Sequence, residues 1–226
     1  MKVLTYHSIG MPPPEAKLKT LYVKPSAFKR QINTLRLLGY RFLSVDHLLK
    51  GNATRRSLLL TFDDAYLDFW ENAFHLLKSQ NIPAVVFVPA MLVGKFNQWD
   101  HRRVNVKKPI MDWQQLRELA QAGVEIGSHS LTHPYLSKIP REKAKREIED
   151  SKKLLEDKLG VQIRAFCYPY GDYNHEVRDL VMQAGYLMAF TTKAGSFEQS
   201  ENLFEIRRIT VFGNDFIPKL LLKILL

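Results

Sequence analysis

Carboxylate and imidazole side chains follow two β-rich runs of this 226-residue chain. The run SLLLTF is followed directly by Asp63 and Asp64, and the run VEIGS is followed by His129 and His133. Two adjacent carboxylates repel each other unless a cation compensates for their charge. Two histidines and one carboxylate with open positions are typical ligands of a catalytic Zn²⁺, and less specifically of Fe²⁺ or Co²⁺. These residues therefore indicate a metal centre that leaves positions open for water.

A third segment, RAFCYPYGDY, contributes an arginine and an aromatic turn. Arg164 opens the segment, and Tyr168 to Gly171 form the turn at its carboxyl end. Taken singly, each feature also has an ordinary structural explanation. An aspartate can cap the helix that follows it, a histidine pair at this spacing often arises by chance, and Arg164 can be a surface charge.

The elements that must position these residues alternate along the chain. Strands are predicted at 2–7, 41–46, 57–62, 83–89, 124–128, 164–169, 186–191 and 205–211, and helices at 26–38, 66–80, 113–122, 140–159 and 174–184. Pro140 and Gly160 are expected to begin and end one of the helices, and Asn174 to cap the next. Such alternation is typical of parallel βαβ units, and eight strands favour a barrel, with residues 1–226 as a single domain. In a barrel, the chemistry lies at the carboxyl ends of the strands.

The composition indicates an ordinary globular protein with a basic surface. Hydrophobic residues make up 46% and charged residues 25%, which excludes a disordered chain. The net charge of +10 suits an anionic partner, such as nucleic acid, a membrane surface or a charged polymer. The single cysteine, Cys167, cannot form an intrachain disulfide, and its apolar neighbours predict that it is buried.

Localisation is predicted from the absence of two patterns. The N-terminal residues contain no apolar run long enough for a secretory signal, and no stretch reaches the ~20 apolar residues that span a bilayer. We therefore expect a cytoplasmic protein, or one peripheral on the cytoplasmic membrane face. Residues 214–226 are expected to form an apolar helix that packs on the barrel or rests at the membrane surface.

Taken in order, TFDD, HSLTH and RAFCYPYG resemble the first three motifs of the polysaccharide deacetylases, the NodB-homology domains of carbohydrate esterase family four. The resemblance extends from about residue 2 to residue 211. It implies a distorted (β/α) barrel of seven to eight parallel strands with outer helices. It also implies the metal-dependent removal of N-acetyl groups from N-acetylhexosamine units of a polysaccharide, oligosaccharide or glycolipid.

The same resemblance implies a role for each motif residue. Asp64, His129 and His133 would hold a divalent metal, with Zn²⁺ expected and Co²⁺, Ni²⁺ or Fe²⁺ as alternatives. Asp63 would be the general base, and Arg164 would pair with it, because a neighbouring cation favours the ionised carboxylate.

Three further residues are assigned to the substrate. The resemblance implies that the backbone N–H of Tyr170 helps to stabilise the oxyanion. Pro169 and Arg208 are expected to contact the substrate, although a salt bridge is as good an explanation for Arg208.

The expected general acid departs from the commonest family pattern. That pattern has a histidine in a late L-x-H motif, but the corresponding run FEIRRITV has none, and no histidine follows His175. Some members carry the acid in an N-terminal Y-H-x-I segment, which Tyr6-His7-Ser8-Ile9 resembles. Since the first and last strands of a closed barrel are neighbours, His7 is expected to be the acid. The alternative is a structural histidine at the end of a strand.

Three rival functions remain open. The chain can be an O-acetyl esterase acting on a polysaccharide such as xylan, or a deacetylase of a lipid-linked sugar at the membrane. A non-catalytic binding module is the third alternative, although such a module needs neither a metal set nor a base. The basic segment HRRVNVKK (101–108) is either a solvated loop or a contact for an anionic substrate or a membrane. No nucleic-acid partner is expected.

Overall fold

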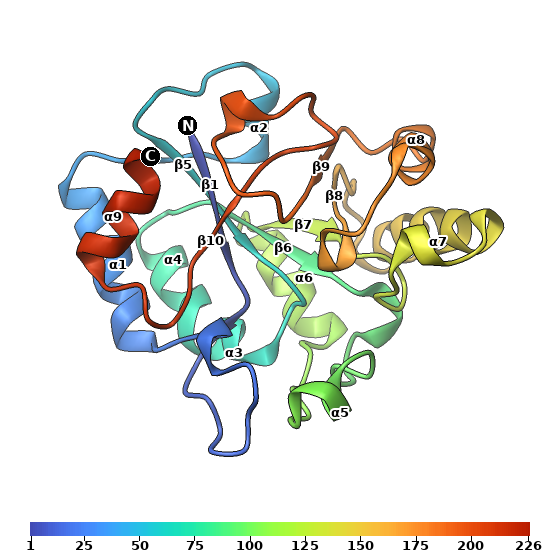
Figure 1. The fold of residues 1–226 in the computed structure, drawn as a ribbon, viewed down its shortest axis with the longest axis horizontal. Helices are drawn as coiled ribbons and strands as arrows, with labels where there is room; N and C mark the ends of the chain where they lie inside the picture. The colour runs from blue at the N-terminus through green and yellow to red at the C-terminus, as the bar shows by residue number, and fades with distance from the viewer.

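Seven parallel strands form the curled sheet at the centre of the molecule. In the computed structural model, which describes residues 1–226, the strand order is β10-β1-β5-β6-β7-β8-β9, and β4 pairs with the start of β5 (Figure 1). The strands are β1 (Lys2–Tyr6), β4 (Arg41–Phe42), β5 (Ser57–Phe62), β6 (Ala84–Val88), β7 (Glu125–Ser128), β8 (Ala165–Cys167), β9 (Met188–Phe190) and β10 (Ile209–Thr210). A separate pair consists of β2 (Ser8–Ile9) and β3 (Tyr22–Val23).

The residues just before and within β10 connect the two edges of this sheet. Ile206 forms a parallel bridge with Phe190 of β9, whereas Ile209 and Thr210 of β10 pair with β1. Only a few residues pair on each side, so the closure is irregular. The predicted distorted (β/α) barrel with parallel strands is confirmed.

Helices surround the sheet (Figure 1). They are α1 (Pro25–Leu37), α2 (Val45–Leu49), α3 (Leu67–Phe69), a π-helical turn (Trp70–Phe74), α4 (His75–Ser79), α5 (His101–Val104), α6 (Trp113–Gln121), α7 (Arg141–Leu159), α8 (His175–Gln183) and α9 (Ile217–Leu225). Short 3₁₀ turns cover Lys19–Leu21, Ala90–Leu92, Leu136–Lys138, Pro169–Gly171 and Phe197–Gln199.

Two helix boundaries differ from the sequence-based expectation. The predicted strand 41–46 is divided, because Ser44 bonds to His47 at 2.8 Å and so begins α2. Pro140 precedes the first helical residue of α7 instead of occupying it, while Gly160 ends this helix with φ of 67°, as expected. Asn174 caps α8 by accepting a bond of 2.9 Å from Val177.

Side chains alternate between the inside of the barrel and the helix-covered outer face, as the two-residue repeat of a strand requires. One apolar cluster contains Val3, Leu59, Val85 and Cys167 from β1, β5, β6 and β8, and it fills the inside. The residues next to these in sequence, such as Leu60, belong to the larger cluster beneath the helices. Asp63 is four residues, or two repeats, after Leu59. Its side chain is therefore also directed into the barrel.

The carboxyl ends of the strands lie at the lower side of Figure 1, since β1 descends from the N-terminus at the top. The loop between β2 and β3 and the short helix α5 lie at this end. Helix α9 lies beside α1 near the other end, where its Leu220 and Ile224 are buried. No helix has the length and apolar character needed to cross a membrane.

Candidate active site

Asp64, His129 and His133 bring three ligand atoms together at the carboxyl ends of β5 and β7. The Nε2 atoms of His129 and His133 lie 3.6 and 3.4 Å from the same carboxylate oxygen, Oδ1 of Asp64. Two donors that each bind one Zn²⁺ at about 2.1 Å in tetrahedral geometry lie about 3.4 Å apart. All three residues are buried, and their ligand atoms lie within 4.8 Å of one another. The donor set therefore fits a divalent cation.

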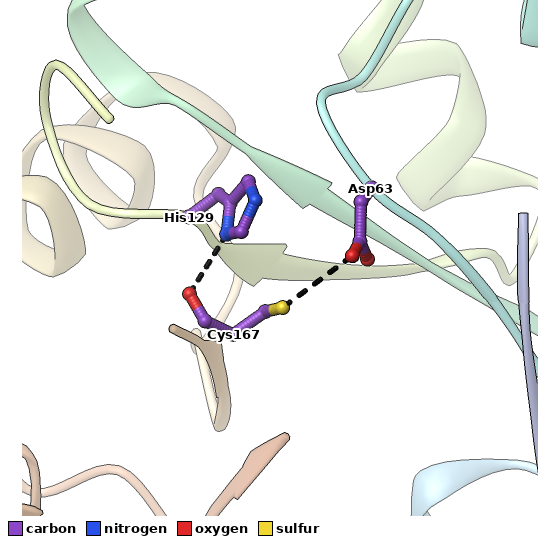
Figure 2. A group of neighbouring side chains, drawn as sticks. All are labelled: Asp63, His129 and Cys167. Carbon is purple, nitrogen blue, oxygen red and sulfur yellow. Dashed lines mark hydrogen bonds between the residues drawn. The ribbon is translucent and has the colours of Figure 1, made fainter. Parts of the chain in front are cut away.

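The imidazole of His129 is oriented by the backbone of β8. Its Nδ1 lies 2.7 Å from the carbonyl oxygen of Cys167 (Figure 2). Because a carbonyl only accepts, Nδ1 carries the proton and Nε2 keeps a free lone pair toward Asp64. Burial and the neighbouring His133 lower the pKa of His129 to about 4, so the ring is neutral at pH 7 and competent as a metal ligand.

The loop that carries both histidines is held by a buried glutamate of α7. Glu147 accepts bonds from the backbone N–H groups of Leu131 and Thr132 at 3.0 and 2.9 Å, and from the Thr132 hydroxyl at 2.6 Å. Sequence reasoning did not single out this residue. A signal was available, because position 147 is three residues after buried Ala144 and four before buried Ser151.

Several residues of the site have left-handed backbone conformations, which are uncommon for side chains other than glycine. Their φ angles are 72° at Asp64, 52° at Ala65, 64° at Ser130, 64° at His133 and 58° at Tyr170. Each costs on the order of 1–3 kcal/mol and persists only where surrounding contacts hold it. One such contact is the bond of 3.0 Å from the His133 N–H to the Ser130 hydroxyl. Strain of this kind gathers at functional sites.

Asp63 forms a buried ion pair with Arg208. The Nη1 and Nη2 atoms of Arg208 donate to Oδ1 and Oδ2 of Asp63, each at 2.8 Å. Arg208 also donates to the Thr191 carbonyl at 2.7 Å and to the Thr61 hydroxyl at 3.1 Å, so its guanidinium is fixed. Burial alone raises the pKa of Asp63, but the Arg208 charge and hydrogen bonds outweigh it and hold the pKa below its usual value. Asp63 is therefore an ionised carboxylate.

Arg164 is not the partner of Asp63, and that expectation is corrected. Its guanidinium bonds to Glu125 at the start of β7, at 3.0 and 2.7 Å, and pairs with Asp46 of α2. The reason is positional, because Arg164 precedes β8 and so lies at the amino end of the strands. It is also one residue out of step with Ala165 and Cys167, which face the inside of the barrel.

Arg208 takes the salt-bridge role that the sequence left open, whereas Pro169 differs from its expected role as a substrate contact. Arg208 is only 2% exposed and is occupied by its ion pair with Asp63. Pro169 is buried in the turn after β8, and it is the flanking residues Tyr168 and Tyr170 that line the cavity of the site. The strained backbone of Tyr170 lies beside the metal set, with its ring 4.5 Å from that of His133.

His7 lies beside the aspartate pair. Strand β1 pairs with β5 so that Tyr6 is opposite Phe62, which places the next residues, His7 and Asp63, opposite each other. The half-buried His7 lines the same cavity as Asp63 and Asp64, and its Nδ1 is buried with no protein partner. The pairing of β1 with β5, and not only its pairing with β10, thus places His7 at the site.

Two segments of the chain form the walls of the cavity, which has a volume of about 130 Å³. The segment between β2 and β3 contributes Leu18, β3 contributes Tyr22, and the region around α5 contributes Trp99 and Arg103. The Trp99 ring stacks on the His133 imidazole with centroids 4.4 Å apart. An aromatic wall beside a few convergent polar groups is typical of a site that binds a small molecule.

A second group of potential ligands, Asp63, His129 and Cys167, also lies within 4.8 Å (Figure 2). The thiol of Cys167 is 3.7 Å from Asp63 Oδ2, and Cys167 is fully buried, as its sequence context predicted. However, Nη2 of Arg208 already donates to the Cys167 sulfur at 3.1 Å as well as to Asp63. A fixed cation therefore neutralises this group, and the set around Asp64 is the better metal site.

Comparisons with known proteins agree with this geometry. A family model described as polysaccharide deacetylase matches residues 50–189. The chain is 27% identical to YxkH of Bacillus subtilis (strain 168) over 216 residues, covering 93% of this chain and 71% of YxkH. It is 26% identical over 213 residues to the poly-beta-1,6-N-acetyl-D-glucosamine N-deacetylase of Staphylococcus aureus (strain MRSA252), covering 88% of this chain and 71% of that protein.

A solved structure extends the similarity to the whole fold. The Streptococcus pyogenes deacetylase PplD, solved in complex with acetate, has a TM-score of 0.84 and 26% identity, covering 99% of this chain and 97% of PplD. Since the family model covers more than half of the chain, the assignment does not depend on any single relative. This chain belongs to the polysaccharide deacetylase family and is an enzyme of the hydrolase class.

Proposed function

We propose that this enzyme is a metal-dependent de-N-acetylase that acts on N-acetylhexosamine units of a glycan. The observation that carries the proposal is the joint placement of an ionised Asp63, a histidine opposite it and a three-ligand metal set around one cavity. The N-acetylglucosamine polymer named for the Staphylococcus aureus relative supports this substrate class.

Hydrolysis of an acetamide needs an activated water, because the amide carbonyl is a poor electrophile. A divalent metal held by Asp64, His129 and His133 would polarise that carbonyl and lower the pKa of the attacking water toward about 7. Asp63 accepts the proton of this water, since Arg208 keeps its carboxylate ionised and fixes its orientation. The backbone N–H of Tyr170 donates to the oxyanion, a contribution of about 3–4 kcal/mol in comparable sites.

The amine must be protonated as it leaves, because it cannot depart as an anion. His7 lines the cavity opposite Asp63 and supplies this proton. A positioned acid contributes roughly 10²–10⁴-fold to the rate. An alkoxide leaving group depends less on an acid, so the importance of His7 separates amide cleavage from ester cleavage.

The test is acetate release by the zinc-loaded enzyme and by its D63N and H7A variants. The substrates are β-1,4- and β-1,6-linked N-acetylglucosamine oligosaccharides, acetylated xylan and a lipid-linked N-acetylhexosamine. H7A should lose 10²-fold or more on the amide substrates while binding zinc normally. H175A, which changes an exposed histidine, is the matched control and should retain full activity.

Other results would change the assignment. Release from xylan alone, with little effect of H7A, would identify an O-acetyl esterase. Acetate release from the lipid-linked sugar alone would identify a membrane-bound substrate. No release from any of these substrates with zinc, cobalt, nickel or iron would overturn the proposal.

A further inference from the structure

Lys108 is a buried lysine in the wall of the catalytic cavity. Its residue is 9% exposed, whereas its basic neighbours Arg102, Arg103 and Lys107 are exposed. The other cavity-lining cation of this segment, Arg103, lies 3.6 Å from Asp100. The basic segment 101–108, expected to be either a solvated loop or an anionic contact, therefore sends one lysine inward.

The backbone of Lys108 is held on both sides. Its N–H donates to the Asn97 side-chain oxygen at 2.7 Å, and its carbonyl accepts from the Asn97 N–H at 3.1 Å. Asn97 is itself fully buried, and Phe96 and Pro109 form a bridge next to it. Lys108 thus projects from a rigid frame, which is the condition for a preorganised contact.

The protein offers the ammonium group of Lys108 fewer hydrogen-bond acceptors than the group has N–H donors. Of its three N–H groups, one bonds to the hydroxyl of Ser8, the residue that follows His7. The ammonium lies over the Tyr66 ring at 3.2 Å from its centroid, and 4.8 Å from that of Tyr22. No other side chain or carbonyl accepts a hydrogen bond from it. A buried donor without an acceptor is costly, so a ligand in this cavity gains by offering one.

The charge of Lys108 is compensated within the fold. Asp68 lies near enough for its charge to act on Lys108, and its Oδ1 is buried without a hydrogen-bond partner. Burial lowers the pKa of Lys108 to about 8, while Asp68, Asp64 and Asp100 act in the opposite direction. Since Asp68 already balances the charge of Lys108, a second carboxylate at the free donors would have no cation of its own. The free donors suit a neutral oxygen better than a carboxylate.

We propose that Lys108 is a specificity-determining residue that donates a hydrogen bond to a hydroxyl oxygen of the bound amino sugar. This inference rests on the proposed de-N-acetylase function and deepens it. Lys108 adjoins His7 through Ser8, so the contacted hydroxyl belongs to the sugar ring whose nitrogen receives the proton, or to the next ring along the glycan. Lys108 takes no part in the proton transfers at the acetamide.

The test compares K108M with K107M on two acetylated substrates. One is an N-acetylglucosamine oligosaccharide, and the other is a small aryl acetate that has no sugar. For K108M we expect KM on the oligosaccharide to rise 10- to 100-fold with kcat changed less than about threefold, as for loss of one buried bond to substrate. Hydrolysis of the aryl acetate should be unchanged, and K107M should resemble the wild type on both substrates.

Oligosaccharides in which one hydroxyl is replaced by hydrogen locate the contact. One of these deoxy substrates should bind the wild type as weakly as the full substrate binds K108M, and K108M should not distinguish the two. If K108M does not fold, K108Q, which can still bond Ser8, carries the same comparison.

Several outcomes would overturn the proposal. The first is an equal loss of K108M activity on both substrates, and the second is an unchanged KM of K108M for the oligosaccharide. The third is a larger effect of K108M on KM for an oligosaccharide that bears a carboxylate. If the wild type is active on the oligosaccharide and K108M is equally active, the role of Lys108 alone is refuted. A wild type that releases no acetate from the oligosaccharide, although D63N lowers its aryl acetate hydrolysis, removes the de-N-acetylase function and the Lys108 role together.

Discussion

The two terminal nitrogens of Arg208 reach different carboxylate oxygens of Asp63, each at 2.8 Å, inside the closed end of the sheet. Both side chains are almost inaccessible, with 1% and 5% of their surfaces exposed. Removing one partner of a buried pair leaves an uncompensated charge and costs about 3–5 kcal/mol. The pair therefore sets both the ionisation and the orientation of Asp63.

Replacing Arg208 should inactivate the enzyme, whereas replacing Arg164 should not. In R208M the pKa of Asp63 rises because burial is no longer opposed, and kcat/KM should fall at least 10²-fold at pH 7. R208K should recover part of the activity, since it restores the charge but not the two-bond geometry. R164M loses a partly exposed pair and should keep its activity, with stability lowered by about 1 kcal/mol or less. Steady-state kinetics and urea unfolding of the three variants measure these effects, and the reverse ranking would refute the assignment of Arg208.

The Asp63–Arg208 pair should make stability depend on pH in a defined direction. The folded-state pKa of Asp63 is lowered, so its contribution is complete above the unfolded value of about 3.9 and is lost as pH falls through the folded value. The difference in unfolding free energy between wild type and D63N should be largest above about pH 4 and shrink at lower pH. Urea unfolding from pH 7 to pH 3 measures it. A difference that grows with acidity would show that the pKa of Asp63 is raised.

Zinc should stabilise the wild type through Asp64 and the two histidines. At a free zinc concentration 100 times Kd, binding to the folded state adds about 2.7 kcal/mol. Thermal unfolding with zinc, compared with the chelator-treated protein, should therefore show a higher Tm for the wild type and little or no shift for D64N or H129A. H175A serves as the control. A full zinc-dependent shift in D64N would exclude this carboxylate as a ligand.

Glu147 should control the geometry of the histidine loop. In E147A the Thr132 N–H loses its acceptor, at a cost of about 1–3 kcal/mol, whereas the Leu131 N–H loses the Glu147 carboxylate but keeps the Glu147 backbone carbonyl at 3.1 Å. Zinc affinity should fall 10- to 100-fold, as for other groups that orient metal ligands. E149A changes a partly exposed glutamate of the same helix and should alter neither property. Calorimetric titration with zinc measures both variants, and equal affinities would exclude a role for Glu147 in the loop.

The strand pattern could be read from the chain because apolar runs bounded by polar residues mark parallel strands directly. All eight predicted strands are present, and the ends of β5 and β7 place Asp63, Asp64 and the histidines together. The pairing of Arg208 could not be read in the same way, because it depends on the irregular closure of the sheet. The family resemblance implied Arg164 as the partner of Asp63, whereas the two-residue alternation from Cys167 would have placed the Arg164 side chain outside the barrel.

The loop contacts were beyond sequence reasoning for another reason. Glu147 and Lys108 resemble the many charged residues around them, and only the three-dimensional path of the chain makes them buried. Of these two, Glu147 had a helical-spacing signal, whereas Lys108 lies in irregular backbone where no periodicity applies. The single strand predicted at 41–46 became β4 and α2 because a local cap at Ser44 favoured a helix.

The closure of the sheet also bears on how the enzyme matures during synthesis. The metal ligands have all been added to the growing polypeptide once residue 133 is made, but Arg208 emerges from the ribosome 75 residues later. Until then Asp63 has no guanidinium partner, and β1 has no β10 beside it. All the proposed metal ligands are thus present in the nascent chain before the partner of the proposed base. The ion pair that keeps Asp63 ionised can form only after residue 208 has been translated.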